Sequence, residues 1–276
     1  MTTLRAYATL AEYKAYVTAR GQTATTDAGD DAVIEMLLKA VSRYFDDRTG
    51  RKFYPYIQTR YFDVPDSRTL KLDADLLEVI TLTNGDGVVI PSTEYAVRPR
   101  NDSPHYSLRL VDNSTYIWAS DGSGDTHDVI SVLGIWGYHN EYARAWANAS
   151  TLAEALDASE TGLDVADGTL YAVGNLIRFD NEIGYVSAIA TNTLTSTRGE
   201  NGSTAATHDS GATARVWQPM EHLKEAVLET AMQPYKRRTG TSTSSTATVT
   251  GAGVVLTPKD IPTLSAAFFE SVRKYT

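Results

Sequence analysis

A change in the spacing of apolar residues near residue 55 is the feature that most constrains the fold. Before it, apolar residues recur at three- and four-residue intervals, the pattern of an amphipathic helix. These residues are Val33, Ile34, Leu37, Leu38, Val41 and Phe45. From Thr59 onward, short runs of alternating apolar and polar residues are separated by Pro, Asn and Gly, as in antiparallel strands joined by tight turns. The chain is therefore expected to be an α+β protein whose helices precede its strands.

Local signals predict where the helices begin and end. Thr9 and Glu12 have the spacing of a capping box, so a helix is expected to start there. Gly50 is expected to end the second helix, because glycine is the preferred residue just past a helix terminus. A second capping-box pattern, Thr151 to Glu154, predicts a short helix, and another helix is expected from Met220 to Pro234.

The charge distribution indicates a separate module in the middle of the chain. The net charge of the 276 residues is -9, and residues 150–218 contain 3 basic and 9 acidic residues. This segment also contains several short strand-like runs, including 170–173 and 176–179. We expect residues 144–218 to be an inserted acidic, all-β domain resembling a barrel or sandwich. Residues 1–143 then form the N-terminal part of a core, 219–238 a helix returning to it, and 239–276 a flexible linker and C-terminal arm.

Composition excludes several function classes. The chain has no cysteine, which removes disulfides, thiolate metal sites and thiol catalysis. Its acidic balance argues against a nucleic-acid-binding surface, which depends on Lys and Arg. No apolar run approaches the ~18 residues of a membrane-spanning helix, and the first residues lack a secretory signal. We therefore expect no membrane partner.

A search for catalytic and metal-binding patterns is negative. The five histidines are isolated, and the phosphate-loop, dinucleotide-binding and serine-hydrolase motifs are missing. Acid pairs such as Asp30-Asp31 and Asp46-Asp47 are explained by capping and solvation at helix ends. No catalytic residue, cofactor or metal is expected.

The order of features between residues 5 and 138 resembles the head–tail connector, or adaptor, proteins of long-tailed bacteriophages. The resemblance rests on sequence runs that include Tyr7-Ala-Thr-Leu10, Asp47-Arg-Thr-Gly-Arg51, Thr59-Arg-Tyr-Phe-Asp63, Asp75 to Leu82 and Gly134-Ile-Trp-Gly-Tyr138. The helix from Glu221 to Gln233 resembles a later helix of that family. The middle domain is an insertion relative to its simplest members, and it resembles small β modules of phage tail components through Glu182-Ile-Gly-Tyr-Val186 and Thr197 to His208.

The resemblance implies a helical connector core with a small sheet and a non-enzymatic, structural role. Members of this family form a ring, usually of twelve copies, below the portal at the phage neck. The implied partners are the portal protein, a stopper or other tail-side neck protein, and further copies of this chain. DNA would pass through the lumen without specific binding. The implied location is the virion neck, after assembly in the host cytoplasm.

The C-terminal arm is the expected protein interface, with the portal or with a neighbouring subunit. Its apolar and basic residues suit insertion into a groove. The candidate interface residues are Ile261, Leu264, Phe268, Phe269, Arg273 and Tyr275. If the arm is a docking element, deleting residues 261–276 should abolish assembly on the portal and leave thermal unfolding of the monomer nearly unchanged.

Two alternatives remain open at this stage. The β domain of a tail or capsid surface protein could bind host carbohydrate, which exposed Trp118 or Trp146 would favour. The chain could also be a hydrolase with an unrecognised pair of carboxylates in a cleft.

Overall fold

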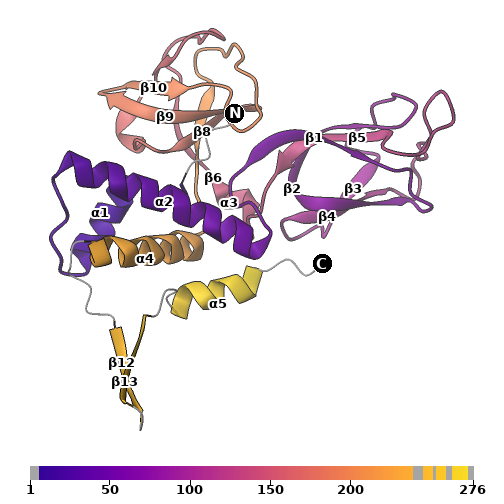
Figure 1. The fold of residues 1–276 in the computed structure, drawn as a ribbon. Coiled ribbons are helices and arrows are strands. Elements are labelled where there is room, and N and C mark those ends of the chain that lie inside the picture. Colours follow the sequence, from indigo (N-terminus) through magenta and orange to yellow (C-terminus); the bar gives the residue numbers. More distant parts are fainter. Residues whose placement is uncertain (1–5, 239–244, 251–252, 259–262, 273–276) are drawn as a thin grey trace. The chain divides into compact units, whose positions relative to one another are not determined.

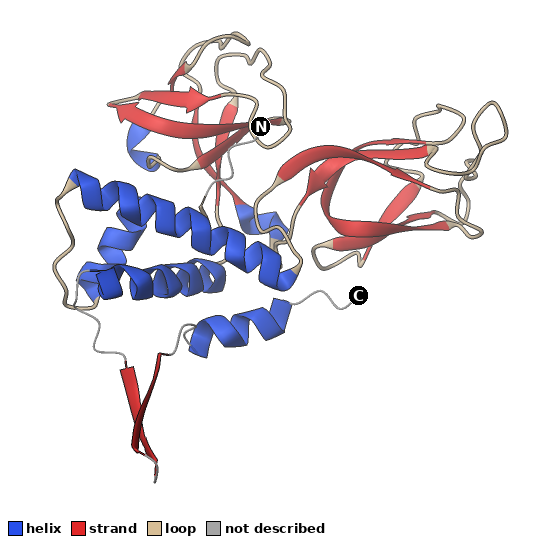
Figure 2. Cartoon of the chain, viewed as in Figure 1, coloured by secondary structure: helices blue, strands red, loops and turns tan. Residues whose placement is uncertain are grey.

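The computed structural model describes residues 6–238, 245–250, 253–258 and 263–272 (Figure 1). Over these residues the protein is mixed α+β, with five α-helices and two multi-stranded antiparallel sheets (Figure 2). The expected α+β class is confirmed. The chain divides into a strand unit, mainly residues 52–171 and 176–218, and a helical unit, residues 3–51, 172–175 and 219–276. Residues 1–143, expected as one N-terminal part, are therefore divided between the two units.

The helical unit begins with α1 (Leu10–Ala19) and α2 (Ala28–Thr49). The predicted capping box is present: the Glu12 amide donates to Thr9 Oγ1, and the Thr9 amide donates to the Glu12 carboxylate at 2.8 Å. Gly50 has a φ of 68° and its amide donates to Asp46 O, which ends α2 as predicted. The buried residues of α2 include Ile34, Leu38, Val41 and Phe45, which all belong to the predicted apolar stripe.

Two further helices, α4 (Glu221–Arg238) and α5 (Thr263–Val272), complete the helical unit. The expectation that the first of them stops at Pro234 is wrong, because α4 continues to Arg238 with the proline inside it. A proline removes one backbone hydrogen bond and strains the preceding turn, but it does not always end a helix. No helix among the described residues is long and apolar enough to cross a membrane.

Part of the expected linker is a hairpin. Strand β12 (Ser245–Thr250) pairs antiparallel with β13 (Gly253–Pro258), with Thr246 opposite Thr257 and Val249 opposite Val254. Residues 245–250, which fall in the segment 239–276 expected to be a linker and C-terminal arm, are thus a strand paired with residues 253–258. The low apolar content of this segment hides its strand signal, which comes from the β-branched residues Thr and Val.

The first sheet of the strand unit has five strands in the order β1-β5-β2-β4-β3. The strands are β1 (Tyr56–Phe62), β2 (Thr69–Thr83), β3 (Tyr95–Arg98), β4 (His105–Leu110) and β5 (Ile130–Trp136). Residues 70–72 and 79–82, two of the short alternating runs of the sequence, belong to the single long strand β2. Its pairing with β4 shifts register between Lys71 and Leu76, so the strand is irregular where the two runs meet. Trp136, Leu76 and Leu108 are fully buried in the core of this sheet.

The second sheet has six strands in the order β6-β11-β8-β9-β10-β7 and follows the short helix α3 (Tyr142–Ala145). The strands are β6 (Trp146–Thr151), β7 (Gly162–Asp164), β8 (Leu176–Phe179), β9 (Glu182–Ala190), β10 (Thr193–Thr197) and β11 (Thr213–Trp217). All six lie within the range 144–218 expected for the inserted domain. Leu152, which follows β6, forms a bridge with Val165, which follows β7, so the two outer strands of the sheet are also connected.

Two local predictions in this region are wrong. The capping-box pattern at Thr151 does not start a helix, because Leu152 is buried in the second-sheet core and pairs with Val165. The run 170–173 is not a strand. A 3-10 turn, Gly168–Leu170, includes its first residue, and the Asp167 side chain caps that turn. At Thr151 tertiary packing overrides a short local pattern, whereas at 170–173 a local capped turn replaces the strand.

Candidate functional site

Helix α5, a described part of the C-terminal arm, packs on the helical unit. Phe268 and Phe269 lie in α5 and are 8% and 6% exposed. Leu264 also lies in α5, but its side chain is outside the described part of the structure. Ile261, Arg273 and Tyr275 lie outside the described residues. The described arm is therefore a helix with a buried face.

The partner surface of α5 is an aromatic cluster on α2. The Phe269 ring centroid lies 4.5 Å from that of Phe45 and 5.8 Å from that of Tyr44. Phe268 lies 5.8 Å from Phe45, which is fully buried. Aromatic pairs at these distances add packing energy beyond the area that they bury. The apolar stripe of α2 in the sequence already contained Phe45, but nothing in the sequence paired it with α5.

Polar contacts determine the register of α5. The hydroxyls of Ser265 and Thr230 lie 2.9 Å apart, and Ser265 Oγ donates to Ala226 O at 3.2 Å. Ser265 is fully buried. At the other end of α5, Arg51 Nε donates to Val272 O at 2.5 Å, which satisfies one of the last carbonyls of the helix. A buried hydroxyl pair and a capping arginine favour one position of the helix over a sliding contact.

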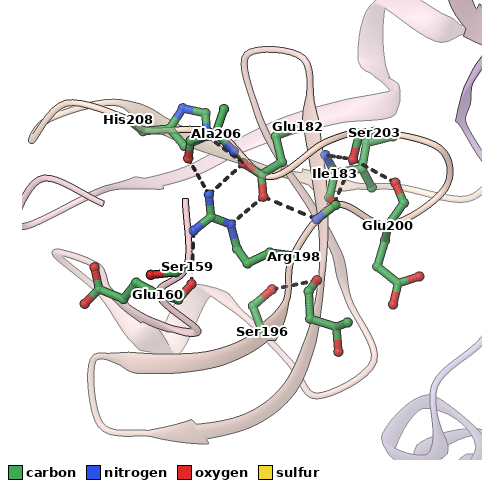
Figure 3. Close-up of polar contacts among 12 residues, drawn as sticks. Ser159, Glu160, Glu182, Ile183, Ser196, Arg198, Glu200, Ser203, Ala206 and His208 are labelled. Carbon is green, nitrogen blue, oxygen red and sulfur yellow. Dashed lines mark hydrogen bonds and ion pairs between the residues drawn. The ribbon is translucent and has the colours of Figure 1, made fainter. Parts of the chain in front are cut away.

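A buried ionic network lies in the second sheet (Figure 3). Arg198 donates two hydrogen bonds to the carboxylate of Glu182. Nε donates to Oε1, and Nη2 donates to Oε2 at 2.7 Å. His208 Nε2 lies 2.9 Å from Glu182 Oε2. The side chains of Glu182, Arg198 and His208 are 1%, 5% and 3% exposed. Charges buried this deeply are tolerated only when they are paired and hydrogen-bonded.

Backbone groups complete this network and connect it to two loops. Arg198 donates to the carbonyls of Asp157, Glu160 and Ala206, and the Ala206 amide donates to Glu182. Burial opposes ionisation of Glu182, but hydrogen bonds from Arg198, His208 and the Ala206 amide outweigh it and lower the pKa of the carboxyl group. The network therefore holds the 157–160 and 198–208 loops against β9 through an ionised carboxylate.

The loop directly after Arg198 joins the two sheets. The Ile57 amide donates to Asn201 O at 2.8 Å, and Asn201 Nδ2 donates to Pro55 O at 2.8 Å. Gly202 has a φ of 81°, and a Cβ there would lie 2.2 Å from Ile57 O. Only glycine allows this conformation and this approach at low cost. The segment from Thr197 to His208 therefore anchors the second sheet to β1.

A second polar contact between the sheets involves Arg178 of β8. Its guanidinium forms a bidentate ion pair with Glu78 of β2, at 2.8 and 3.1 Å. Tyr142 of α3 donates its hydroxyl to the same carboxylate at 2.8 Å. Burial opposes ionisation of Glu78, yet these hydrogen bonds lower the pKa of its carboxyl group.

An apolar cluster from both sheets surrounds this ion pair. It contains Leu77, Ile135, Leu176, Ile183 and Trp217. The second sheet is thus packed firmly on the first sheet.

The other sequence candidates do not converge on one site. His139 contacts Gln218 O at 3.1 Å, and His105 contacts Pro99 O at 2.8 Å, so both rings have structural partners. Trp118 and Trp146 are partly buried, the first against the core of the first sheet and the second against Trp217. Within the described residues, no group of three His, Asp or Glu side chains is arranged to hold a metal ion.

The sequence contained few signals for the two anchoring networks. Glu182, Arg198 and His208 are separated by strands and loops, and only the fold brings them together. The contacts described above are structural in character. Those within the strand unit fix loops and sheets, and those within the helical unit fix α5. No protein-family model and no curated protein matches the chain.

Proposed function

We propose that the protein is a head–tail adaptor of a long-tailed bacteriophage. In this proposal it is a non-enzymatic virion protein that forms a ring under the portal at the neck. It joins the capsid to tail-side neck proteins and continues the DNA channel.

The observation that carries the proposal is the way in which both ends of the chain build one helical unit. Helices α1 and α2 come from the N-terminal part, and α4 and α5 from the C-terminal part. Phe45 and Phe269 connect the two parts directly. Helices, then strands, then a returning helix follow one another along the chain, which is the order on which the family resemblance rests. The helical unit is proposed to be the connector core.

The finer architecture of the inserted domain is also part of the proposal. We take it to be a barrel-like module, since the bridge between Leu152 and Val165 connects the outer strands of its sheet. The amide of Ala153 donates to Asp164 O at 2.8 Å, and that of Ala166 to Thr151 O at 2.9 Å, which adds to the same connection. A closed sheet has no free edge and is protected from unwanted strand pairing.

The buried contacts of α5 restrict how the arm binds in a ring. Phe268 and Phe269 can reach a portal or a neighbouring subunit only after α5 leaves the face of α2. We propose that the arm is released on assembly and that the aromatic pair then enters a groove of the partner. The carbohydrate-binding alternative requires an exposed tryptophan at Trp118 or Trp146. Both side chains are partly buried, so no observation favours that function.

Electron microscopy of negatively stained complexes tests the proposal. The portal ring encoded in the same genome is imaged alone and after mixing with the purified chain. The proposal predicts an additional ring of density at one end of the portal. Portal particles that look the same with and without the chain would contradict it. A portal from an unrelated phage serves as the specificity control.

A further inference from the structure

One end of the first sheet combines exposed apolar side chains with strong negative charge. Three loop segments lie there, and we call them together the loop end. They are residues 63–68 after β1, 84–89 after β2, and 111–129 between β4 and β5. Together they contain seven aspartates and one arginine. Ile117 is 70% exposed, Val89 54% and Val88 45%. Most large apolar side chains elsewhere in the unit are buried, so three exposed ones in connected loops need an explanation.

Hydrogen bonds from buried groups hold these three segments together. Asn84 is 3% exposed; its Nδ2 donates to Ile117 O at 2.9 Å, and its Oδ1 accepts from the Ala119 amide at 3.1 Å. A Cβ at Gly85 would lie 2.1 Å from Ala119 O, so the two loops touch where a glycine permits it. The loop that carries Ile117 is therefore fixed against the turn that carries Val88 and Val89.

The remaining segment is fixed in the same way. The Asp128 amide donates to Asp63 Oδ1 at 2.9 Å, and the Val64 amide donates to Thr126 O at 2.8 Å. Arg68 donates to Val111 O at 2.5 Å. A surface whose backbone is already ordered loses little conformational entropy when a partner binds. The loop end thus has the features of a prepared binding surface.

We propose that the loop end binds a protein surface that presents apolar side chains surrounded by lysine or arginine. The exposed Ile117, Val88 and Val89 provide the apolar centre. The aspartates provide a rim with net negative charge, in which Asp112 pairs with Arg109 at 2.8 Å and Asp63 lies 3.5 Å from His127. Such a rim selects a basic partner and repels acidic ones and nucleic acid. The proposal is independent of the adaptor function, because it depends only on the chemistry of these loops.

The test uses a defined probe, a fluorescent amphipathic peptide of leucine and lysine, and the full chain. Fluorescence anisotropy measures binding at low and at high salt. The proposal predicts binding at low salt that weakens strongly at high salt. Ile117→Asn should weaken binding about tenfold, which corresponds to about 1.4 kcal/mol, because it removes an apolar side chain from the centre of the contact. Asp66→Asn with Asp112→Asn should weaken binding and reduce its salt dependence.

The matched control is Leu170→Asn, which removes a 51% exposed apolar side chain from the second sheet of the same unit. It should leave peptide binding unchanged, and thermal unfolding should show that all variants remain folded. The proposal is overturned if the peptide does not bind at low salt, or if Ile117→Asn and Leu170→Asn have equal effects. It is also overturned if light scattering shows that Ile117→Asn instead disrupts self-association of the chain.

Discussion

Phe45 and Phe269 lie with their ring centroids 4.5 Å apart, although one belongs to the second helix and the other to the last. Both side chains are buried, so this contact is part of the core of the helical unit. It connects the two ends of the chain and makes the C-terminal arm a structural element before any partner binds.

Phe269→Ala should therefore destabilise the helical unit. Removing a buried phenylalanine costs about 3–5 kcal/mol through lost transfer energy and the remaining cavity. Chemical denaturation followed by circular dichroism measures this change. Met36→Ala on α2, where the side chain is 59% exposed, is the control and should change stability by less than about 0.5 kcal/mol. Equal effects of the two substitutions would show that α5 does not pack on α2 in solution.

Deletion of residues 261–276 should lower the thermal unfolding temperature as well as prevent assembly. This corrects the expectation from sequence that the monomer's unfolding would be nearly unchanged, because the deletion removes Phe268, Phe269 and the buried Ser265. Differential scanning calorimetry of the truncated and full chains measures the shift. A truncated chain that unfolds at the same temperature would restore the view of the arm as a separate docking segment.

Arg198→Met should strongly destabilise the second sheet. It leaves the carboxylate of Glu182 buried without its main partner, and breaking a buried ion pair in this way costs about 3–5 kcal/mol. The control is Lys39→Met, which breaks a surface pair with Glu35 at 3.9 Å and should cost at most about 0.5 kcal/mol. Adding Glu182→Gln to Arg198→Met should recover part of the loss, because the uncompensated charge is then gone. Urea titrations of the four proteins test these differences.

Stability should fall in acid through the carboxyl groups of Glu182 and Glu78. The fold lowers the pKa of each group below the ordinary value of 4.5, so each contributes stability that is present above that value. The contribution is lost as pH falls through the lower pKa of the folded state. Thermal unfolding measured from neutral pH to about pH 3 should show this decline. Glu182→Gln should flatten it, whereas Glu35→Gln on the surface of α2 should not.

Gly202→Ala should destabilise the protein more than Gly211→Ala. The two glycines have similar φ angles of 81° and 85°, so the backbone cost of a side chain is similar at both. A Cβ at Gly202 would meet Ile57 O at 2.2 Å, whereas a Cβ at Gly211 has nothing within 4 Å. The difference in unfolding free energy therefore measures the contact between the 199–203 loop and β1. Equal losses would mean that this contact is not formed in solution.

The sequence predicted the parts of the fold that depend on local signals. The Thr9 capping box, the Gly50 stop and the stripe around Phe45 are all where their patterns place them. Short patterns failed where distant residues compete, as at Thr151, where burial of Leu152 replaces a helix start. The continuation of α4 past Pro234 could not be foreseen from a residue that usually ends helices.

The networks that organise the candidate site were beyond the reach of the sequence. Arg198 and Glu182 are ordinary charged residues until the fold removes both from water. Likewise, the apolar arm clearly required a surface, but only the structure identifies Phe45 as part of it. Long-range pairing of this kind leaves no periodic pattern, so it is found only in three dimensions.

Native mass spectrometry of the chain mixed with the portal encoded in the same genome tests the adaptor proposal most directly. The proposal predicts a species whose mass equals the portal ring plus a ring of copies of this chain. Spectra that contain only the portal ring and the free chain, under conditions in which the portal assembles, would contradict it.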